Sequence, residues 1–266
     1  MPKNLLLTLA ALLAWGGLTA PAGAQTDGLY LAPKLGVSFF TGNNSIDYGG
    51  GREFSKRGHS TSFAGALALG YDFVGQGIPL RTELEFTLRA PFNTENNYDY
   101  HDGATGRRML NQQRSNIHTL MFNTFVDLHN DSAFTPYIGA GLGLAFVKGK
   151  NRYSVIGGDP FNQGTGNEIY SREASASDRK FAWSLAGGGA WELTSNVSLD
   201  LGYRYFHFNN LNMGNHSRST YQEWVLNPGD GSYDLVSMSG NDPSARARAK
   251  RVGLHEVMLG LRITAD

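Results

Sequence analysis

Eight segments of the chain alternate, residue by residue, between apolar side chains and polar or small ones. The clearest reads LRTELEFTLR (80–89), in which leucines and a phenylalanine interleave with arginines, glutamates and a threonine. Successive side chains of a β-strand point to opposite faces, so each segment is predicted to be a strand with one apolar and one polar face. The eight segments are residues 28–40, 62–74, 80–89, 116–130, 136–149, 179–193, 197–208 and 252–263.

The lengths of these segments and of their connections point to one architecture. Segments of ten residues or more are long for a soluble sheet but match the ~9–11 residues that cross a bilayer at a tilt. The tight connections are residues 75–79, 131–135 and 194–196. The long, polar connections are residues 41–61, 90–115, 150–178 and 209–251. This asymmetry predicts an all-β, closed, eight-stranded antiparallel up-and-down transmembrane β-barrel, with short periplasmic turns and long extracellular loops.

The first residues carry an export pattern. Lys3 precedes an apolar run at 5–18, and Ala22-Gly23-Ala24 places small residues around a cleavage position. This order is typical of a secretory signal peptide, so we expect cleavage of residues 1–24 after Sec-dependent export, which leaves residues 25–266 as the barrel domain. An uncleaved membrane anchor is the alternative, although the apolar run is short for a spanning helix.

The composition excludes several kinds of chemistry. There is no cysteine, which excludes disulfides, thiolate metal sites and cysteine nucleophiles. Lys plus Arg and Asp plus Glu both number 23, so the chain has no net positive charge that would indicate nucleic acid as a partner.

The polar faces carry charges that a membrane barrel would turn inward. In such a barrel the apolar face meets lipid and the polar face lines the lumen. The charged residues on the polar faces are Lys34, Asp72, Arg81, Glu83, Glu85, Arg89, Asp127, Glu192, Asp200, Arg204, Glu256 and Arg262. Buried charges must be paired, and eight strands enclose room only for side chains, so we expect a lumen filled by ion pairs. The small residues Gly139, Gly141, Gly143 and Gly188 would leave room for the arginine and glutamate side chains.

Aromatic residues recur near the ends of the predicted strands, where rings at the two membrane interfaces are expected. They are Phe39, Phe40, Tyr71, Phe73, Phe146, Phe181, Trp183, Trp191, Tyr203, Tyr205 and Phe208. The alternative is a soluble lipocalin-like or sandwich protein whose apolar face forms the core. The strand lengths and the concentration of charge on the polar faces argue against it.

Three stretches resemble a known family. YIGAGLGLAFV (137–147), FAWSLAGGGAWELTSNVSLDLGYRY (181–205) and HEVMLGLRI (255–263) are similar to the porin/opacity-type outer-membrane β-barrels, which include OmpA-like and OmpX-like domains and the opacity adhesins. The resemblance implies a bacterial outer-membrane location, insertion by the barrel assembly machinery, and surface roles of the loops such as adhesion. Members often end in an aromatic residue. Here residues 264–266 are Thr-Ala-Asp, which implies a weaker or inward-shifted assembly signal.

The sequence offers little for catalysis. YRYFHFNN (203–210) resembles the lipid A deacylase barrels, but Asn209 stands where their nucleophilic serine would be, and an amide cannot serve as that nucleophile. Asp99, His101 and Asp102 form a tight cluster within one predicted loop, which is a poor site for preorganised catalysis. No histidines show close metal-ligand spacing. We therefore expect no catalytic residue, cofactor or metal site.

The densest charge feature is RARAKR (246–251), just before the last predicted strand. One interpretation is contact with lipopolysaccharide phosphates or another acidic polymer through charge-assisted hydrogen bonds. The other is a rim that pairs with acidic loop residues. The cations are Arg246, Arg248, Lys250 and Arg251, and the acids are Glu223, Asp230, Asp234 and Asp242.

These observations favour a non-enzymatic outer-membrane surface protein. Its loops would serve adhesion or binding of an extracellular ligand, and its barrel would contribute to envelope structure. Its partners would be outer-membrane lipid and lipopolysaccharide, with the barrel assembly machinery during biogenesis. A small porin-like diffusion channel is the second hypothesis, and an outer-membrane lipid hydrolase is the third.

Overall fold

The structure is a computed structural model that describes residues 28–47, 53–102, 105–129, 132–157, 168–209, 211–213, 216–226, 229, 233–241 and 246–265. Within some strands, including 42–47, 96–102 and 246–251, it describes the backbone and not the side chains. Among the described residues, no helix combines the length and apolar character needed to cross a bilayer.

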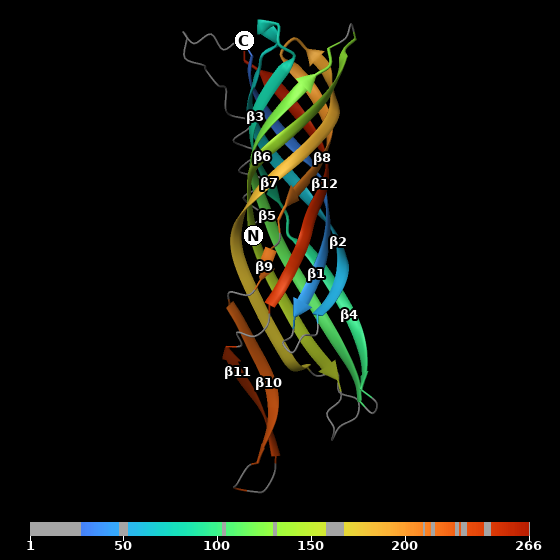
Figure 1. Cartoon of the computed structure of the whole chain (residues 1–266), viewed down its shortest axis with the longest axis vertical. Coiled ribbons are helices and arrows are strands. Elements are labelled where there is room, and N and C mark those ends of the chain that lie inside the picture. The colour runs from blue at the N-terminus through green and yellow to red at the C-terminus, as the bar shows by residue number, and fades with distance from the viewer. Residues whose placement is uncertain are drawn as a thin grey trace.

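Eight strands close into an antiparallel barrel (Figure 1). In order around the ring they are β1 (Leu29–Asp47), β2 (Glu53–Asp72), β3 (Leu80–Arg89), β5 (Thr105–Asp127), β6 (Phe134–Gly157), β7 (Glu168–Thr194), β8 (Val197–Phe208) and β12 (Arg246–Thr264). Pairing of β12 with β1 closes the ring. The further strands are β4 (Phe92–Asp102), β9 (Leu211–Met213), β10 (His216–Leu226) and β11 (Tyr233–Asn241). The predicted eight-stranded architecture is confirmed.

The strands are tilted relative to the barrel axis, because each strand is offset along its neighbour and the offsets add up around the barrel. A path that starts at Tyr30 and steps to the paired residue on each next strand returns to β1 at Phe40, ten residues further along. The path is Tyr30, Gly70, Glu83, Asn123, Gly141, Ser184, Phe206, Leu254 and Phe40. Such an advance requires strands tilted by roughly 40° to the barrel axis. All residues on this path are buried, so the path runs inside the lumen.

Tight turns join the strands at one end of the barrel. Between β2 and β3 the chain forms the 3-10 turn η1 (Val74–Gln76), followed by Gly77 at a φ of 77°. This left-handed conformation suits glycine, which lacks a Cβ. Between β7 and β8 only Ser195 and Asn196 separate the strands. Both turns fall where the sequence predicted them.

The connections predicted as long loops are largely β-hairpins. Figure 1 shows them projecting from the other end of the barrel, with β10 and β11 furthest out. The outermost paired residues are Asp47 with Glu53, Asp102 with Thr105, Ile156 with Glu168, and Leu226 with Tyr233. Continued pairing satisfies backbone groups that an irregular loop would leave to water. The sequence did not predict these hairpin strands, because the segments are rich in Gly, Asn and Ser, which have low strand propensity.

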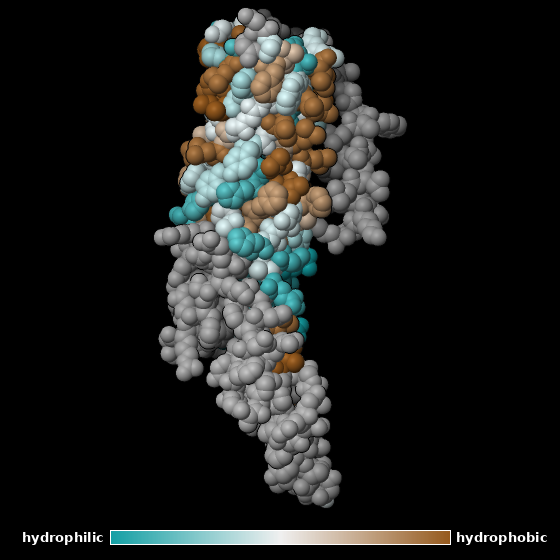
Figure 2. Space-filling view, turned by 90° about the vertical axis from the view of Figure 1, so that its right-hand side faces the viewer, coloured by the Kyte–Doolittle hydropathy of each residue, from teal (hydrophilic) through white to brown (hydrophobic). Residues whose placement is uncertain are grey.

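The outward faces of the barrel strands are apolar. Leu35 and Phe63 expose 71% and 78% of their surfaces, and Leu84, Phe122 and Leu142 each expose more than half. Figure 2 shows apolar side chains gathered around one part of the molecule, with hydrophilic residues beyond its lower margin. Side chains of the opposite parity are buried. The apolar faces therefore point outward, as expected for a barrel in lipid.

Candidate functional site

The periplasmic half of the lumen holds a network of buried charges, and β3 is its main source. Its side chains Arg81, Glu83, Glu85 and Arg89 are at most 4% exposed. They alternate with lipid-facing leucines and a phenylalanine that are 40–52% exposed. The period of two in this segment thus places four charges in a row along one wall of the lumen.

Glu83 lies at the centre of one group. Its carboxylate accepts hydrogen bonds from Lys34 Nζ at 2.5 Å and from the Tyr30 hydroxyl at 3.0 Å. Arg81 donates to the same carboxylate at 3.3 Å and contacts Asp127 through Nε at 2.9 Å. Each charge in this group has an opposite partner, which a buried charge requires.

Glu85 and Glu256 form a second group that crosses the lumen. Arg204 donates to Glu85 at 2.5 Å and to Glu256 at 2.6 Å. Lys34 also contacts Glu85, at 2.8 Å, so Lys34 joins the two groups. Glu256 accepts from Arg89 Nε at 2.5 Å and is 0% exposed. The network connects residues from β1, β3, β8 and β12, and therefore links opposite walls of the barrel.

The third group, nearest the turns, is looser. The guanidinium of Arg262 lies 3.6 Å from Asp72, 3.8 Å from Asp200 and 3.9 Å from Asp127. Neither carboxylate oxygen of Asp200 accepts a hydrogen bond within the described residues. Distances of this length are contacts between charges rather than good hydrogen bonds.

Eleven of the twelve charged residues predicted to face the lumen form these ion pairs. The exception is Glu192, which is exposed near the end of β7. Its parity is inward, but it lies two residues before Thr194, where the strand ends at the turn. The lumen does not extend that far, so alternation alone placed Glu192 wrongly.

The inward glycines make room for side chains, but not mainly for charged ones. A Cβ on Gly139 would meet the Phe125 ring at 2.3 Å, and one on Gly188 would meet the Tyr137 hydroxyl at 2.6 Å. The two rings in turn flank Arg81, whose guanidinium carbon lies 4.4 and 4.5 Å from their centroids. Gly139 and Gly188 therefore leave room for the two aromatic rings, and the rings hold the Arg81 guanidinium between them.

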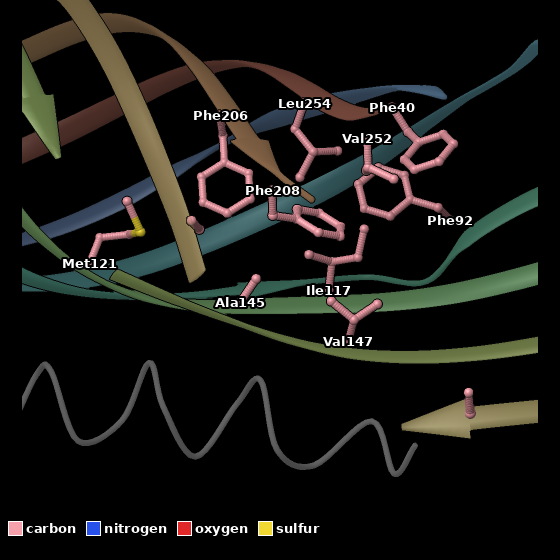
Figure 3. Close-up of a cluster of buried hydrophobic side chains, with 12 residues drawn as sticks. Phe40, Phe92, Ile117, Met121, Ala145, Val147, Phe206, Phe208, Val252 and Leu254 are labelled. Carbon is pink, nitrogen blue, oxygen red and sulfur yellow. The ribbon is translucent and has the colours of Figure 1, made fainter. Parts of the chain in front are cut away.

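The extracellular half of the lumen contains a cluster of apolar side chains. Figure 3 shows side chains from several strands meeting there, and each is at most 8% exposed. The cluster, which we call the apolar layer, consists of Phe40, Phe92, Ile117, Met121, Ala145, Val147, Ala176, Ala182, Phe206, Phe208, Val252 and Leu254. The Phe40 and Phe92 rings lie 5.6 Å apart, and those of Phe206 and Phe208 lie 5.9 Å apart. Ion pairs and the apolar layer together occupy the described lumen.

The sequence did not predict the apolar layer. Phe40 and Phe208 were expected at the membrane interface, yet they are 4% and 1% exposed and lie inside the barrel. The missed signal is parity, because Phe206 and Phe208 fall on the same face of β8 as Asp200 and Arg204. Aromatic residues at inward positions belong to the core of the barrel rather than to its interface.

The lipid-facing surface of β7, β8 and β12 holds an aromatic and histidine cluster. The Tyr203 hydroxyl lies 2.6 Å from His255 Nδ1, and Tyr205 packs at 5.2 Å from the His255 ring. The His207 ring packs in a tilted arrangement 5.4 Å from the Trp183 ring. Within the described parts of the chain, no group of three or more His, Cys, Asp or Glu side chains could hold a metal ion.

The predicted anion-contact residues lie on β12 beyond the barrel. There Arg246, Arg248 and Lys250 pair with the end of β1. The side chains of these residues and of Arg251 lie outside the described residues, so their contacts stay a prediction. Near them in the protruding hairpins, Tyr153 is 7% exposed and packs on Tyr170 at 6.1 Å. Burial raises the pKa of Tyr153 to about 12.

Residues 9–226 match the outer membrane protein β-barrel domain. The chain belongs to this family. It is a protein of the bacterial outer membrane, and the apolar surface of its barrel faces lipid.

The chain matches most of the length of one curated relative and about half the length of two others. The chain is 31% identical over 207 residues to the outer membrane protein PagN of Salmonella typhimurium, which covers 73% of this chain and 79% of PagN. It is 30% identical over 175 residues to an uncharacterized protein of Brucella abortus, covering 63% and 51%. A Rickettsia conorii protein named as a proposed adhesin is 29% identical over 149 residues, covering 55% and 53%.

The comparison with solved structures found outer-membrane proteins of low identity. OprG of Pseudomonas aeruginosa is 12% identical, with 90% of this chain and 98% of OprG covered and a TM-score of 0.45. Neisserial surface protein A is 18% identical, with 90% and 97% covered and a TM-score of 0.37.

Proposed function

We propose that this protein is a non-enzymatic surface protein whose barrel is a closed anchor and whose hairpins bind an extracellular ligand in adhesion. The observation that carries the proposal is strand length. β6 has 24 residues and β7 has 27, whereas ~9–11 residues suffice to cross a bilayer. More than half of each strand is therefore available to stand outside the membrane.

The protruding part has an interior of its own, which supports a binding role. Asn111 and Asn151 hydrogen-bond to each other at 2.8 Å and are 2% and 6% exposed. Further out, Tyr153 on β6 and Arg172 on the neighbouring strand β7 are also buried. A hairpin bundle with buried polar contacts keeps its shape, and a preorganised surface loses less entropy when it binds.

The relatives support the same class of function. One is an outer membrane protein, PagN, and another carries the name of a proposed adhesin. The filled lumen favours this function over a diffusion channel, since ion pairs and the apolar layer occupy the path that a solute would take. Asn209 in place of a nucleophile disfavours a lipid hydrolase.

The test is surface display followed by an adherence assay. The full chain is expressed in a non-adherent Gram-negative strain, and bacteria bound to a cultured epithelial monolayer are counted. Replacing residues 216–241, which contain β10 and β11, with a short Gly-Ser turn should reduce adherence by about tenfold or more. The matched control replaces residues 194–196, a turn at the opposite end of the barrel.

Gel heat-modifiability verifies that both variants fold. Equal adherence of the hairpin variant and the control would show that β10 and β11 do not bind. Adherence no greater than that of the empty strain, with the intact barrel at the surface, would refute adhesion as the function.

A further inference from the structure

Four cations lie together on the outward face of neighbouring strands. Arg114 comes from β5, Lys148 and Lys150 from β6, and Arg179 from β7, and all are exposed. Arg114 is directly opposite Lys150 in the β5–β6 ladder. Arg179 is directly opposite Phe146, two residues before Lys148. We call these four residues the outer cation patch.

The outer cation patch begins where the apolar surface ends. Leu142 and Leu144 on β6 face outward and are 59% and 43% exposed, and Phe146 follows them on the same face. The next outward residues are Lys148 and Lys150. The Arg179 guanidinium lies over the Phe146 ring, 5.9 Å from its centroid. In a bilayer, cations next to an interfacial ring lie at the level of the lipid headgroups.

The patch has no anionic partner within the described chain. Like charges directly opposite in a ladder repel, as Arg114 and Lys150 do. The carboxylates nearby are engaged elsewhere, because Glu173 pairs with Arg152 at 3.7 Å and Asp178 with Lys180 at 2.6 Å. None of the four cations forms an ion pair with any described residue. These exposed charges are therefore available to an anion from outside the described part of the protein.

Among the described side chains, the opposite side of the barrel lacks this feature. On β1 and β2, the described outward residues at the corresponding edge are Thr41, Thr61 and His59. The described cations are thus concentrated in the sector of β5 to β7. Two arginines and two lysines this close together fit a discrete ligand with several negative charges.

We propose that the outer cation patch binds the phosphate groups of lipid A in the outer leaflet. Lipid A matches both parts of the surface, because its acyl chains would lie along Leu142, Leu144 and Phe146 while its phosphates reach the cations above. Guanidinium groups bind phosphate oxygens in pairs, and lysines add point charges. This site is separate from the hairpin tips, so it stands or falls independently of the proposed adhesion.

The experiment measures unfolding of the folded barrel in zwitterionic detergent while bisphosphoryl lipid A is added. Lipid A should raise the Tm of the natural chain. In the variant Lys148→Gln/Lys150→Gln the apparent affinity should fall roughly 30-fold, since two cations are removed. The matched control is Arg152→Gln/Arg218→Gln, which removes the same charge further from the apolar surface and should keep the full increase in Tm.

Parallel measurements with other lipids show which anionic group is bound. Lipid A without phosphates and phosphatidylglycerol should each raise Tm much less than bisphosphoryl lipid A, and 0.5 M salt should weaken the effect. Equal Tm increases in the patch variant and the control variant would overturn the site. An equal increase with phosphate-free lipid A would mean that acyl chains alone bind. An equal increase with phosphatidylglycerol would overturn the assignment to lipid A.

Discussion

The two halves of the lumen are equally buried but are filled by different interactions. In the periplasmic half, Glu83 and Glu256 are at most 1% exposed and contact three arginines and a lysine. In the extracellular half, Phe206 and Phe208 are also at most 1% exposed and pack within the apolar layer, where the only charged contact described for these two rings is the Arg89 guanidinium, 5.4 Å from the centroid of Phe206. All of these side chains have the same inward parity. Alternation therefore determines that a residue is buried, whereas the residues on the facing walls determine which interactions it makes.

This difference predicts different responses to loss of a side chain. A buried carboxylate that is removed leaves its cations without compensation, and those cations cannot reach water. A buried ring that is removed leaves a cavity, into which neighbouring apolar side chains relax in part. The charged half should therefore be sensitive to which charges remain, and the apolar half to how much volume remains.

The largest effect is expected for Glu256→Ala. This change removes the carboxylate that pairs with Arg89 and leaves Arg204 with Glu85 alone. The buried network then holds one uncompensated positive charge, and the free energy of unfolding should fall by about 3–5 kcal/mol. The measurement is urea-induced unfolding of the barrel in lipid vesicles. The matched control is Glu173→Ala, which removes an exposed partner of Arg152 and should cost about 0–1 kcal/mol. Similar losses in both variants would contradict the role of the buried pairs.

A somewhat smaller loss, about 3 kcal/mol, is expected for Phe206→Ala in the apolar layer. The loss should depend little on salt, because Arg89, whose guanidinium lies 5.4 Å from the Phe206 ring, keeps its ion pair with Glu256. Phe206→Leu retains most of the volume and should cost about 1 kcal/mol. The same urea titration at two salt concentrations distinguishes the halves. A loss that varied with salt would show that the apolar layer also shields the charges beneath it.

The sequence was sufficient to predict the charged half but not the apolar half. Charged residues at alternating positions, such as Arg81, Glu83 and Glu85, are unambiguous, since a lipid-facing charge is costly. An aromatic residue is compatible with either face. Phe208 at a strand end fits an interfacial ring and a lumen core equally well by residue type, and its shared parity with Asp200 and Arg204 on β8 is what places it inside.

The ends of the strands were the second limit of prediction. Glu192 has inward parity but lies too near the turn to be enclosed. At the other end, the polar segment 150–157 continues β6 although its composition resembles a loop. Where the barrel stops depends on the tilt and stagger of all eight strands, and no single segment contains that information.

The looser end of the charged half should show a smaller effect. Arg262 has its three carboxylates at 3.6–3.9 Å, and its side chain is 11% exposed. Arg262→Gln should therefore reduce the free energy of unfolding by only about 1 kcal/mol, because long contacts near solvent contribute little. The urea titration used for Glu256→Ala measures it. A loss as large as that of Glu256→Ala would mean that the ion pairs tighten in lipid and that the charged half is uniform.

The smallest effect concerns ion conductance through the lumen, which no single substitution should change. Charges and rings occupy the lumen at successive depths, so the barrel in a planar bilayer should show no steady single-channel conductance. Glu256→Ala alone leaves the apolar layer in place, and Phe206→Ala alone leaves the ion pairs, so neither should open a path. Only a variant that thins both halves, such as Glu256→Ala combined with Phe206→Ala and Phe208→Ala, removes side chains along the whole lumen. Discrete conductance steps in the unmodified protein would show that the halves do not close the barrel, and steps in one single variant would identify which half is the barrier.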